Sequence, residues 1–404
     1  MNKEELLLID MLDSAIKGKK KIFNIDNVDI KNVLNEAKAH DIKGLIYTAF
    51  DNSLHNNIDE NLLENWKKDT FFTGLYQNKM ISRLGKLLQY FKEKKIDIIV
   101  LKGLVIRNLY PVPDQRTMGD ADILVKKEDL NKSINLLTEL GFKVEKGKCD
   151  HHIGFSHDYY GKVELHWKVT RDRCFKGDSS FEDSFWSDVI TIKVGEAEVL
   201  ALSYENELTH LCLHKAVHMT SSGFGLRQLC DLTLLVENKK YEIDWVKFLE
   251  KIKSCKIEKF TAYIFEICNK LFGMEIPNIF NTKELIDETY VNEFIDNIIK
   301  NGTHGKREGV SVFATQVAFN TNKEGDDKKF MKNFLRIIFP KVENMSYKYN
   351  YAKKYKLLTP IAWVHHVFAG AFNKDYNFYE KCKFMVNTVS KSKDKYSLLA
   401  ELDL

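Results

Sequence analysis

The scarcity of proline constrains the fold of this chain more than any other feature. Only five prolines occur in 404 residues, and all of them lie at or after Pro111. Because helix interiors exclude proline most strongly, such a chain is expected to be mostly helical. Apolar residues make up 44% of the sequence and charged residues 29%, which is the balance of a globular protein. The length predicts two to three domains with at least one sizeable core.

Charge, hydropathy and cysteine content exclude several classes of protein. No apolar run approaches the roughly 20 residues that span a bilayer, so no membrane partner is expected. The net charge is only +4, which argues against an extended nucleic-acid partner. The seven cysteines form no CxxC pair, and this favours reduced thiols and a cytoplasmic location over a disulfide framework.

Three regions follow one another along the chain. Residues 1–95 show helical spacing, most clearly in a proline-free stretch at 60–94. Residues 96–202 form a predicted core in which short β-branched runs alternate with turns, a brief helix at 104–110 and a longer helix at 129–140. Helical spacing returns in residues 203–404. We therefore predict an α+β protein, with a small mixed sheet embedded between two helical regions. The expected strands are 96–101, 120–125, 142–145, 153–160, 162–169 and 190–194.

Two acids in the strand expected at 120–125 are the first candidate site residues. Side chains alternate along a strand, so Asp120 and Asp122 share one face while Ala121 and Ile123 share the other. Two carboxylates at this spacing suit Mg²⁺, which proteins bind through one or two carboxylates and substrate phosphates. A solvated strand face also explains the pair, because the same spacing recurs in the Glu196-Ala197-Glu198 tripeptide.

A third acid lies on the strand expected at 162–169. There Glu164, His166 and Lys168 share a polar face, opposite the apolar side chains of Val163 and Leu165. If this strand lies beside the Asp pair, Glu164 completes a metal site, and the polar neighbours suit a substrate that carries phosphate. The alternative is an ordinary solvated face on a half-covered sheet.

The dipeptide Lys102-Gly103 lies where the first strand turns into a short helix. Glycine allows a phosphate to approach the backbone closely, and a helix N-terminus favours anions. Lys102 adds a point charge. A plain turn is the alternative interpretation of this dipeptide.

The order of these pieces resembles the nucleotidyltransferase fold of DNA polymerase β-like enzymes, and more narrowly a bacterial family of uncharacterised nucleotidyltransferases. The resemblance spans roughly residues 80 to 250 and is most specific around residues 116–125. Its motifs are Leu101-Lys102-Gly103, Tyr110-Pro111, the segment 116–125, Gly141-Phe142, His151-His152, the segment 163–167, Glu207-Leu208 with His210, His214 and His218, the segment 229–232 and Ile243-Asp244-Trp245.

The resemblance implies a role for each candidate residue. Asp120 and Asp122 would bind Mg²⁺, and Glu164 would be the third acid, acting as a metal ligand, as a base or as both. The residues that would contact nucleotide phosphates are Lys102, Gly103 and Arg116, together with the polar neighbours His166 and Lys168. The chain departs from the wider superfamily at residues 102–103, where most members have Gly-Ser and therefore a hydroxyl for the phosphate.

The histidines of the C-terminal region form a separate candidate. His210, His214 and His218 recur every four residues, so they follow one face of a helix. This face either borders the acceptor cleft or makes structural hydrogen bonds, and metal binding is the weakest alternative because three such ligands on one helix converge poorly on one ion. Arg227 and Asp231 are also four residues apart, and we predict a helix pair or a buried anchor there.

The function implied by the resemblance is Mg²⁺-dependent transfer of a nucleoside monophosphate from a nucleoside triphosphate, with release of pyrophosphate. The acceptor stays open among a small molecule, a peptide and a protein. The alternative is a module on the same fold that binds nucleotide without turnover, or that acts in a toxin–antitoxin pair.

Overall fold

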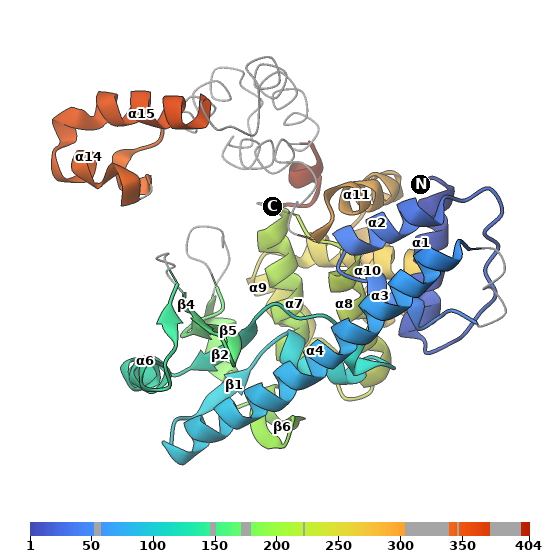
Figure 1. Cartoon of the computed structure of the whole chain (residues 1–404), viewed down its shortest axis with the longest axis horizontal. Coiled ribbons are helices and arrows are strands. Elements are labelled where there is room, and N and C mark those ends of the chain that lie inside the picture. Colours follow the sequence, from blue (N-terminus) through green and yellow to red (C-terminus); the bar gives the residue numbers. More distant parts are fainter. Residues whose placement is uncertain are drawn as a thin grey trace. The chain divides into compact units, whose positions relative to one another are not determined.

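One mixed sheet of seven strands organises the part of the chain that carries the candidate acids. The computed structural model describes residues 1–51, 58–145, 151–170, 179–220, 223–303, 339–345, 347–371 and 397–404. The strand order is β3-β4-β5-β2-β1-β7-β6, and the sheet with its flanking helices is shown in Figure 1. The strands are β1 (Ile98–Val100), β2 (Ala121–Val125), β3 (Lys143–Val144), β4 (His152–His157), β5 (Gly161–His166), β6 (Val189–Val194) and β7 (Ala197–Leu202).

The chain is divided into two compact units. The first comprises Met1–Val217 and Phe224–Thr303, and the second comprises His218–Gly223 and His304–Leu404. The boundaries expected after residues 95 and 202 both fall inside the first unit, between an element of the sheet and a helix. The division into three domains stays a prediction.

Helices make up most of the first unit, as the low proline content predicts, and together with the mixed sheet they confirm the predicted α+β fold class. Those before the sheet are α1 (Lys3–Ile16), α2 (Ile30–Ala39), α3 (Lys43–Tyr47) and α4 (Glu60–Glu93). Between strands lie α5 (Gly103–Ile106) and α6 (Leu130–Glu139). After the sheet come α7 (Tyr204–Met219), α8 (Leu226–Lys239), α9 (Trp245–Ser254), α10 (Glu258–Phe272) and α11 (Glu288–Asn301).

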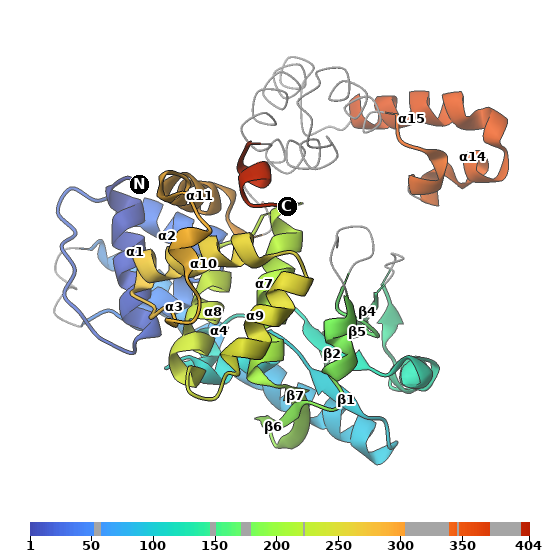
Figure 2. The same ribbon diagram turned by 180° about the vertical axis from the view of Figure 1, so that it is seen from behind.

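The two helical regions meet each other as well as the sheet. Helix α10 contacts α1, α8, α9 and α11, so helices from both ends of the first unit pack together, and Figure 2 shows these helices from behind. The long helix α4 packs on β6 and β7. Gly85 permits this close approach, because a Cβ there would lie 2.7 Å from the carbonyl oxygen of Val194. The short helix α5 contacts β2 and α8.

Several local expectations agree with the structure and two do not. The proline-free stretch forms α4, and the predicted hairpin forms from β4 and β5. Strand β5 ends at His166, so Lys168 lies beyond it. Strand β7 was not predicted, although it pairs parallel with β1 in the centre of the sheet. Helical spacing in the C-terminal region also predicts a helix at 329–338, and this stretch lies outside the described residues.

The second unit contains α14 (Asn350–Lys354) and α15 (Thr359–Ala371) among its described residues. A small apolar cluster joins them, formed by Val342, Met345, Tyr349, Ala352 and Ala362. Across the described part of both units, every helix is too short or too polar to cross a membrane.

Candidate active site

Neighbouring strands hold two of the three predicted acids, Asp122 and Glu164, opposite each other. Strands β2 and β5 run parallel, and their register pairs Asp122 directly with Glu164. The intervening Ile123 and Leu165 are fully buried, as the alternation of side chains requires. Asp120 immediately precedes β2 and is exposed. The strand face predicted from the sequence therefore presents three carboxylates at one end of the β2–β5 pair.

Lys102 lies against this face. Its Nζ atom lies 2.7 Å from Oδ1 of Asp122, in an ion pair whose two side chains are 15% and 10% exposed. The backbone of Lys102 has a positive φ of 50°, which is rare for a residue with a Cβ. Its N–H donates to Oε1 of the buried Glu207 on α7 at 2.9 Å. The turn before α5 is thus held from both sides, by the sheet and by a helix.

His166 joins the acids rather than facing outward. Its Nε2 lies 3.0 Å from Oδ1 of Asp122 and 3.4 Å from Oε2 of Glu164, and the side chain is only 5% exposed. Asp122, Glu164 and His166 each offer a ligand atom within 4.8 Å of the others, which is close enough to hold one metal ion. The predicted phosphate contact of His166 is not tested by this geometry, but its ring is already engaged by two carboxylates.

The surroundings of this face shift the pKa of Asp122 and the pKa of Asp120 in opposite directions. Burial alone would raise the pKa of Asp122, but Lys102 and His166 hold it well below its ordinary value. For Asp120, partial loss of water and the negative charges of Asp122 and Glu164 raise the pKa. Three carboxylates that repel one another and share one ammonium have the donor chemistry of a divalent-cation site, because oxygen ligands suit Mg²⁺.

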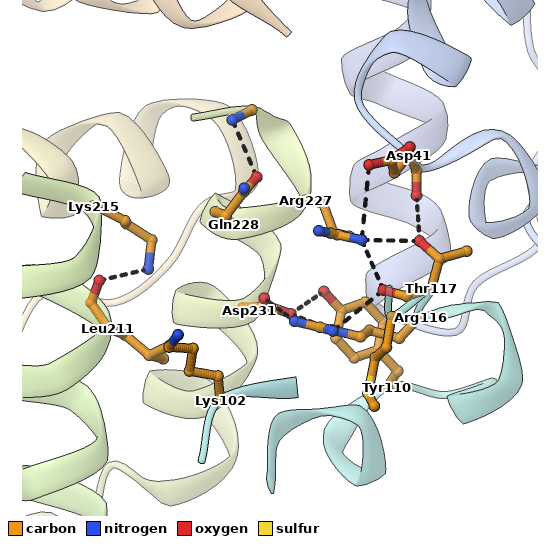
Figure 3. A network of polar contacts seen from close by, with 12 residues as sticks. Asp41, Lys102, Tyr110, Arg116, Thr117, Leu211, Lys215, Arg227, Gln228 and Asp231 are labelled. Carbon is orange, nitrogen blue, oxygen red and sulfur yellow. Dashed lines mark hydrogen bonds and ion pairs between the residues drawn. The ribbon is translucent and has the colours of Figure 1, made fainter. Parts of the chain in front are cut away.

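Gly103 and Arg116 lie against each other at the start of α5. A Cβ at Gly103 would lie 2.5 Å from Nη1 of Arg116 and 2.9 Å from Sδ of Met118, so the first turn of α5 accepts only glycine without rearrangement. Arg116 is bound on its other side by Asp231 of α8, through Nε at 3.1 Å and Nη2 at 2.6 Å. Tyr110 donates a third hydrogen bond to the same carboxylate at 2.7 Å. Figure 3 shows this buried group.

The anchor predicted at Arg227 and Asp231 exists, but with different partners. Asp231 is bound by Arg116 and Tyr110. Nη1 of Arg227 donates instead to the carbonyl oxygen of Thr117, at 2.7 Å, and to its hydroxyl, at 3.0 Å (Figure 3). Both residues of α8 therefore hold the segment that leads into Asp120.

The three histidines of α7 do not share one environment. His210 is buried, and burial together with the charge of Lys102 lowers its pKa well below the ordinary value, so its ring is neutral. The ring of His214 lies 6.2 Å from that of His210, centroid to centroid. His218 is assigned to the second compact unit. The role of these histidines at an acceptor cleft stays a prediction.

Sequence reasoning assigned no role to two groups that border the acids. Glu207 was noted only as part of a motif, and its contact with residue 102 spans 105 positions. His151 and His152 were likewise noted without a role, and His152 pairs with His166 across the β4–β5 hairpin. In both cases the proximity to the acids depends on strand register or on the packing of a helix, and a local sequence pattern reveals neither.

The mixed sheet and its paired acids agree with the nucleotidyltransferase class that the motifs predicted, and the family comparison shows this class. The chain belongs to the family of uncharacterised nucleotidyltransferases, whose family model matches residues 26–273, more than half of the chain. This match confirms the resemblance drawn from the motifs and extends it toward the N-terminus. No curated protein matches the chain.

Three solved structures are similar to parts of the chain. The lincosamide antibiotic adenylyltransferase LnuA, in a lincomycin-bound crystal structure, is 17% identical, with 38% of this chain and 94% of that chain covered and a TM-score of 0.28. The antibiotic-resistance factor ANT(2'')-Ia is 12% identical, with coverage of 46% and 95% and a TM-score of 0.33. An antigenic nucleotidyltransferase-like protein from Paracoccidioides brasiliensis is 14% identical, with coverage of 43% and 93% and a TM-score of 0.24.

Proposed function

We propose that this protein transfers a nucleoside monophosphate from a nucleoside triphosphate to an acceptor nucleophile, with Mg²⁺ as cofactor and pyrophosphate as the leaving group. The observation that carries the proposal is the direct pairing of Asp122 with Glu164 across parallel strands, beside Asp120. Membership of a nucleotidyltransferase family supports it independently. The acceptor stays open among a small molecule, a peptide and a protein.

In this proposal the three acids hold the metal. Asp120 and Asp122 would be ligands of Mg²⁺, which would neutralise charge on the phosphates and activate the attacking group. Glu164 has a side chain that is 32% exposed, so it is open to an acceptor as well as to a cation. It serves as the third ligand, as the base that takes the acceptor proton, or as both.

Gly103 stands where most of the superfamily has a phosphate-binding serine, and in this proposal the ammonium of the preceding Lys102 supplies the missing phosphate contact. Its ammonium and a metal ion compete for the same carboxylate, since Nζ lies 2.7 Å from Oδ1 of Asp122. Binding of a metal–triphosphate complex would release Lys102 from Asp122 and leave its ammonium beside the phosphate oxygens. Arg116 acts in the proposal mainly by position, because its guanidinium is bound to Asp231.

Nucleotide binding and transfer can be tested separately. We expect the full-length protein to bind at least one common nucleoside triphosphate in the presence of Mg²⁺, measured by calorimetry with a non-hydrolysable analogue. It should also transfer label from an α-³²P-labelled nucleotide to a component of cell extract. Asp122→Asn should abolish the transfer, because an amide is a poorer ligand for Mg²⁺ than a carboxylate.

The chain offers a matched control for this substitution. Glu196 and Glu198 have the same acid-x-acid spacing as Asp120 and Asp122, but they lie at the turn into β7 and on β7 itself. The double variant Glu196→Gln/Glu198→Gln should retain full transfer. Binding without transfer in every extract would favour the alternative of a binding module. Absence of binding with all four nucleotides would contradict both functions.

A further inference from the structure

Three histidines converge beside the acids. His152 begins β4, and the hairpin register pairs it with His166 at the end of β5, while His151 directly precedes β4. One ring nitrogen from each of the three lies within 4.8 Å of the others. His151 and His166 are each only 4% exposed. Buried imidazoles in such a group require either hydrogen-bond partners or a metal ion.

The spacing of the first two rings matches ligands of one metal. Nδ1 of His152 and Nε2 of His151 lie 2.9 Å apart. With metal–nitrogen bonds of about 2.0–2.1 Å, two imidazole ligands of one ion have nitrogens about 2.9 to 3.4 Å apart. A hydrogen bond between the two rings has the same length, so this distance needs a second observation.

His166 provides that observation. Its Nε2 lies 3.0 Å from Oδ1 of Asp122, while its Nδ1 is buried and has no hydrogen-bond partner among the described residues. Histidines that bind metals usually donate one ring N–H to a carboxylate, which fixes the tautomer and leaves the second nitrogen for the ion. A buried nitrogen without a partner is otherwise costly.

The donor type indicates which metals would bind. Imidazole nitrogens suit zinc, nickel, cobalt and copper, whereas Mg²⁺ prefers oxygen. We propose that His151, His152 and His166 form a binding site for a borderline-soft divalent cation of the Zn²⁺ class, adjoining the proposed Mg²⁺ site through His166, which contacts Asp122 and Glu164. Three protein ligands leave a fourth position open. Glu164 lies at the opposite nitrogen of the His152 ring, with Oε1 3.6 Å from Nε2.

Metal binding at the histidines does not depend on nucleotide transfer. The test uses full-length protein freed of metal with a chelator and titrated by calorimetry with ZnCl₂ or with MgCl₂. We expect one Zn²⁺ per chain at the histidine site. His151→Asn and His152→Asn should each weaken Zn²⁺ binding at least about tenfold. Co²⁺ should give visible d–d absorption bands in the wild type that the same two variants lose.

Two variants distinguish the histidine site from metal binding elsewhere on the chain. His157→Asn changes a histidine at the other end of β4, where its Nδ1 accepts a hydrogen bond from the N–H of Tyr159, and it should leave Zn²⁺ affinity unchanged. Asp120→Asn should weaken Mg²⁺ binding and retain the Zn²⁺ site, so the two cation proposals can fail independently. Circular dichroism confirms that each variant is folded.

The proposal is overturned if the wild type binds Zn²⁺ no more tightly than Mg²⁺. It is also overturned if the double variant His151→Asn/His152→Asn retains the wild-type affinity for Zn²⁺, since the ion would then be bound elsewhere, for example by cysteines. Loss of binding in His157→Asn equal to that in His151→Asn would likewise refute it, because the effect would then lack site specificity.

Discussion

Replacement of Asp231 by asparagine should destabilise the first unit strongly. The carboxylate accepts hydrogen bonds from Nε and Nη2 of Arg116 and from the hydroxyl of Tyr110, and both charged side chains are less than a tenth exposed. Asparagine keeps the shape and one acceptor oxygen but leaves the guanidinium buried without a counter-charge. Removal of one partner from a buried pair costs about 3–5 kcal/mol. We expect a loss near the lower end of that range.

The matched control is a surface ion pair in the same unit, formed by a residue that precedes β1 and one that follows β2. Asp97 contacts Nζ of Lys126 at 3.2 Å, with side chains 65% and 34% exposed, so Asp97→Asn should cost less than about 1 kcal/mol. Urea unfolding followed by circular dichroism measures both variants. If Asp231→Asn unfolds at the same urea concentration as Asp97→Asn, the buried pair is not the anchor that its geometry implies.

The dependence of this effect on pH follows from the sign of the pKa shift. Burial alone would raise the pKa of Asp231, but Arg116 lowers it below the ordinary 3.8. The unfolded chain therefore takes up the proton at a higher pH than the folded one does. The stabilisation is complete at neutral pH and is lost as the pH falls below about 4 through the folded pKa. The difference between wild type and Asp231→Asn should shrink over the same range.

Two further predictions concern the turn before α5. Burial raises the pKa of Glu207 from 4.5 to about 8, so the stability of the wild type should fall as the pH rises between these values. In Glu207→Gln this slope should become shallower in thermal unfolding between pH 5 and 9, because the contribution of residue 207 is lost, and an unchanged slope would contradict the assignment. Gly103→Val should cost about 1–3 kcal/mol by crowding Arg116, whereas Gly119→Ala, with no atom within 4 Å of the added Cβ, should unfold like the wild type in urea.

Periodicity made the acid face predictable from the sequence. Asp120, Asp122 and Glu164 occupy alternate positions in runs of β-branched and apolar residues, and such alternation requires no knowledge of the partner strand. Their pairing across β2 and β5 then followed from the assumption that the strands are neighbours. Strand β7 escaped prediction because Glu196 and Glu198 were considered only as a second acidic pair. Its partner β1 lies about a hundred residues earlier, and no local pattern indicates this pairing.

The histidine group shows that a small error in the predicted position of a turn changes which residues pair along the whole hairpin. The strands expected at 153–160 and 162–169 imply a turn centred on Gly161, which would pair residue 160 with residue 162. The observed turn lies earlier and pairs His157 with Gly161. This difference in register places His152 opposite His166 instead of near residue 170. The chemistry of both rings was visible in the sequence, but their proximity depended on where the chain reverses.

The helices of the first unit have a more direct connection to the acids than the sequence suggested. We expected them to shape the acceptor site, and the contacts show that α7 and α8 hold the two segments that carry the candidate site. Glu207 of α7 accepts the N–H of Lys102, whose positive φ is a strained conformation that needs external support. Asp231 of α8 binds Arg116, four residues before Asp120. Helix α8 also packs on α10, so the support of Arg116 extends into a helical region far from the acids in the sequence. The segment 96–202 therefore contains the acids but not the residues of α7 and α8 that hold Lys102 and Arg116.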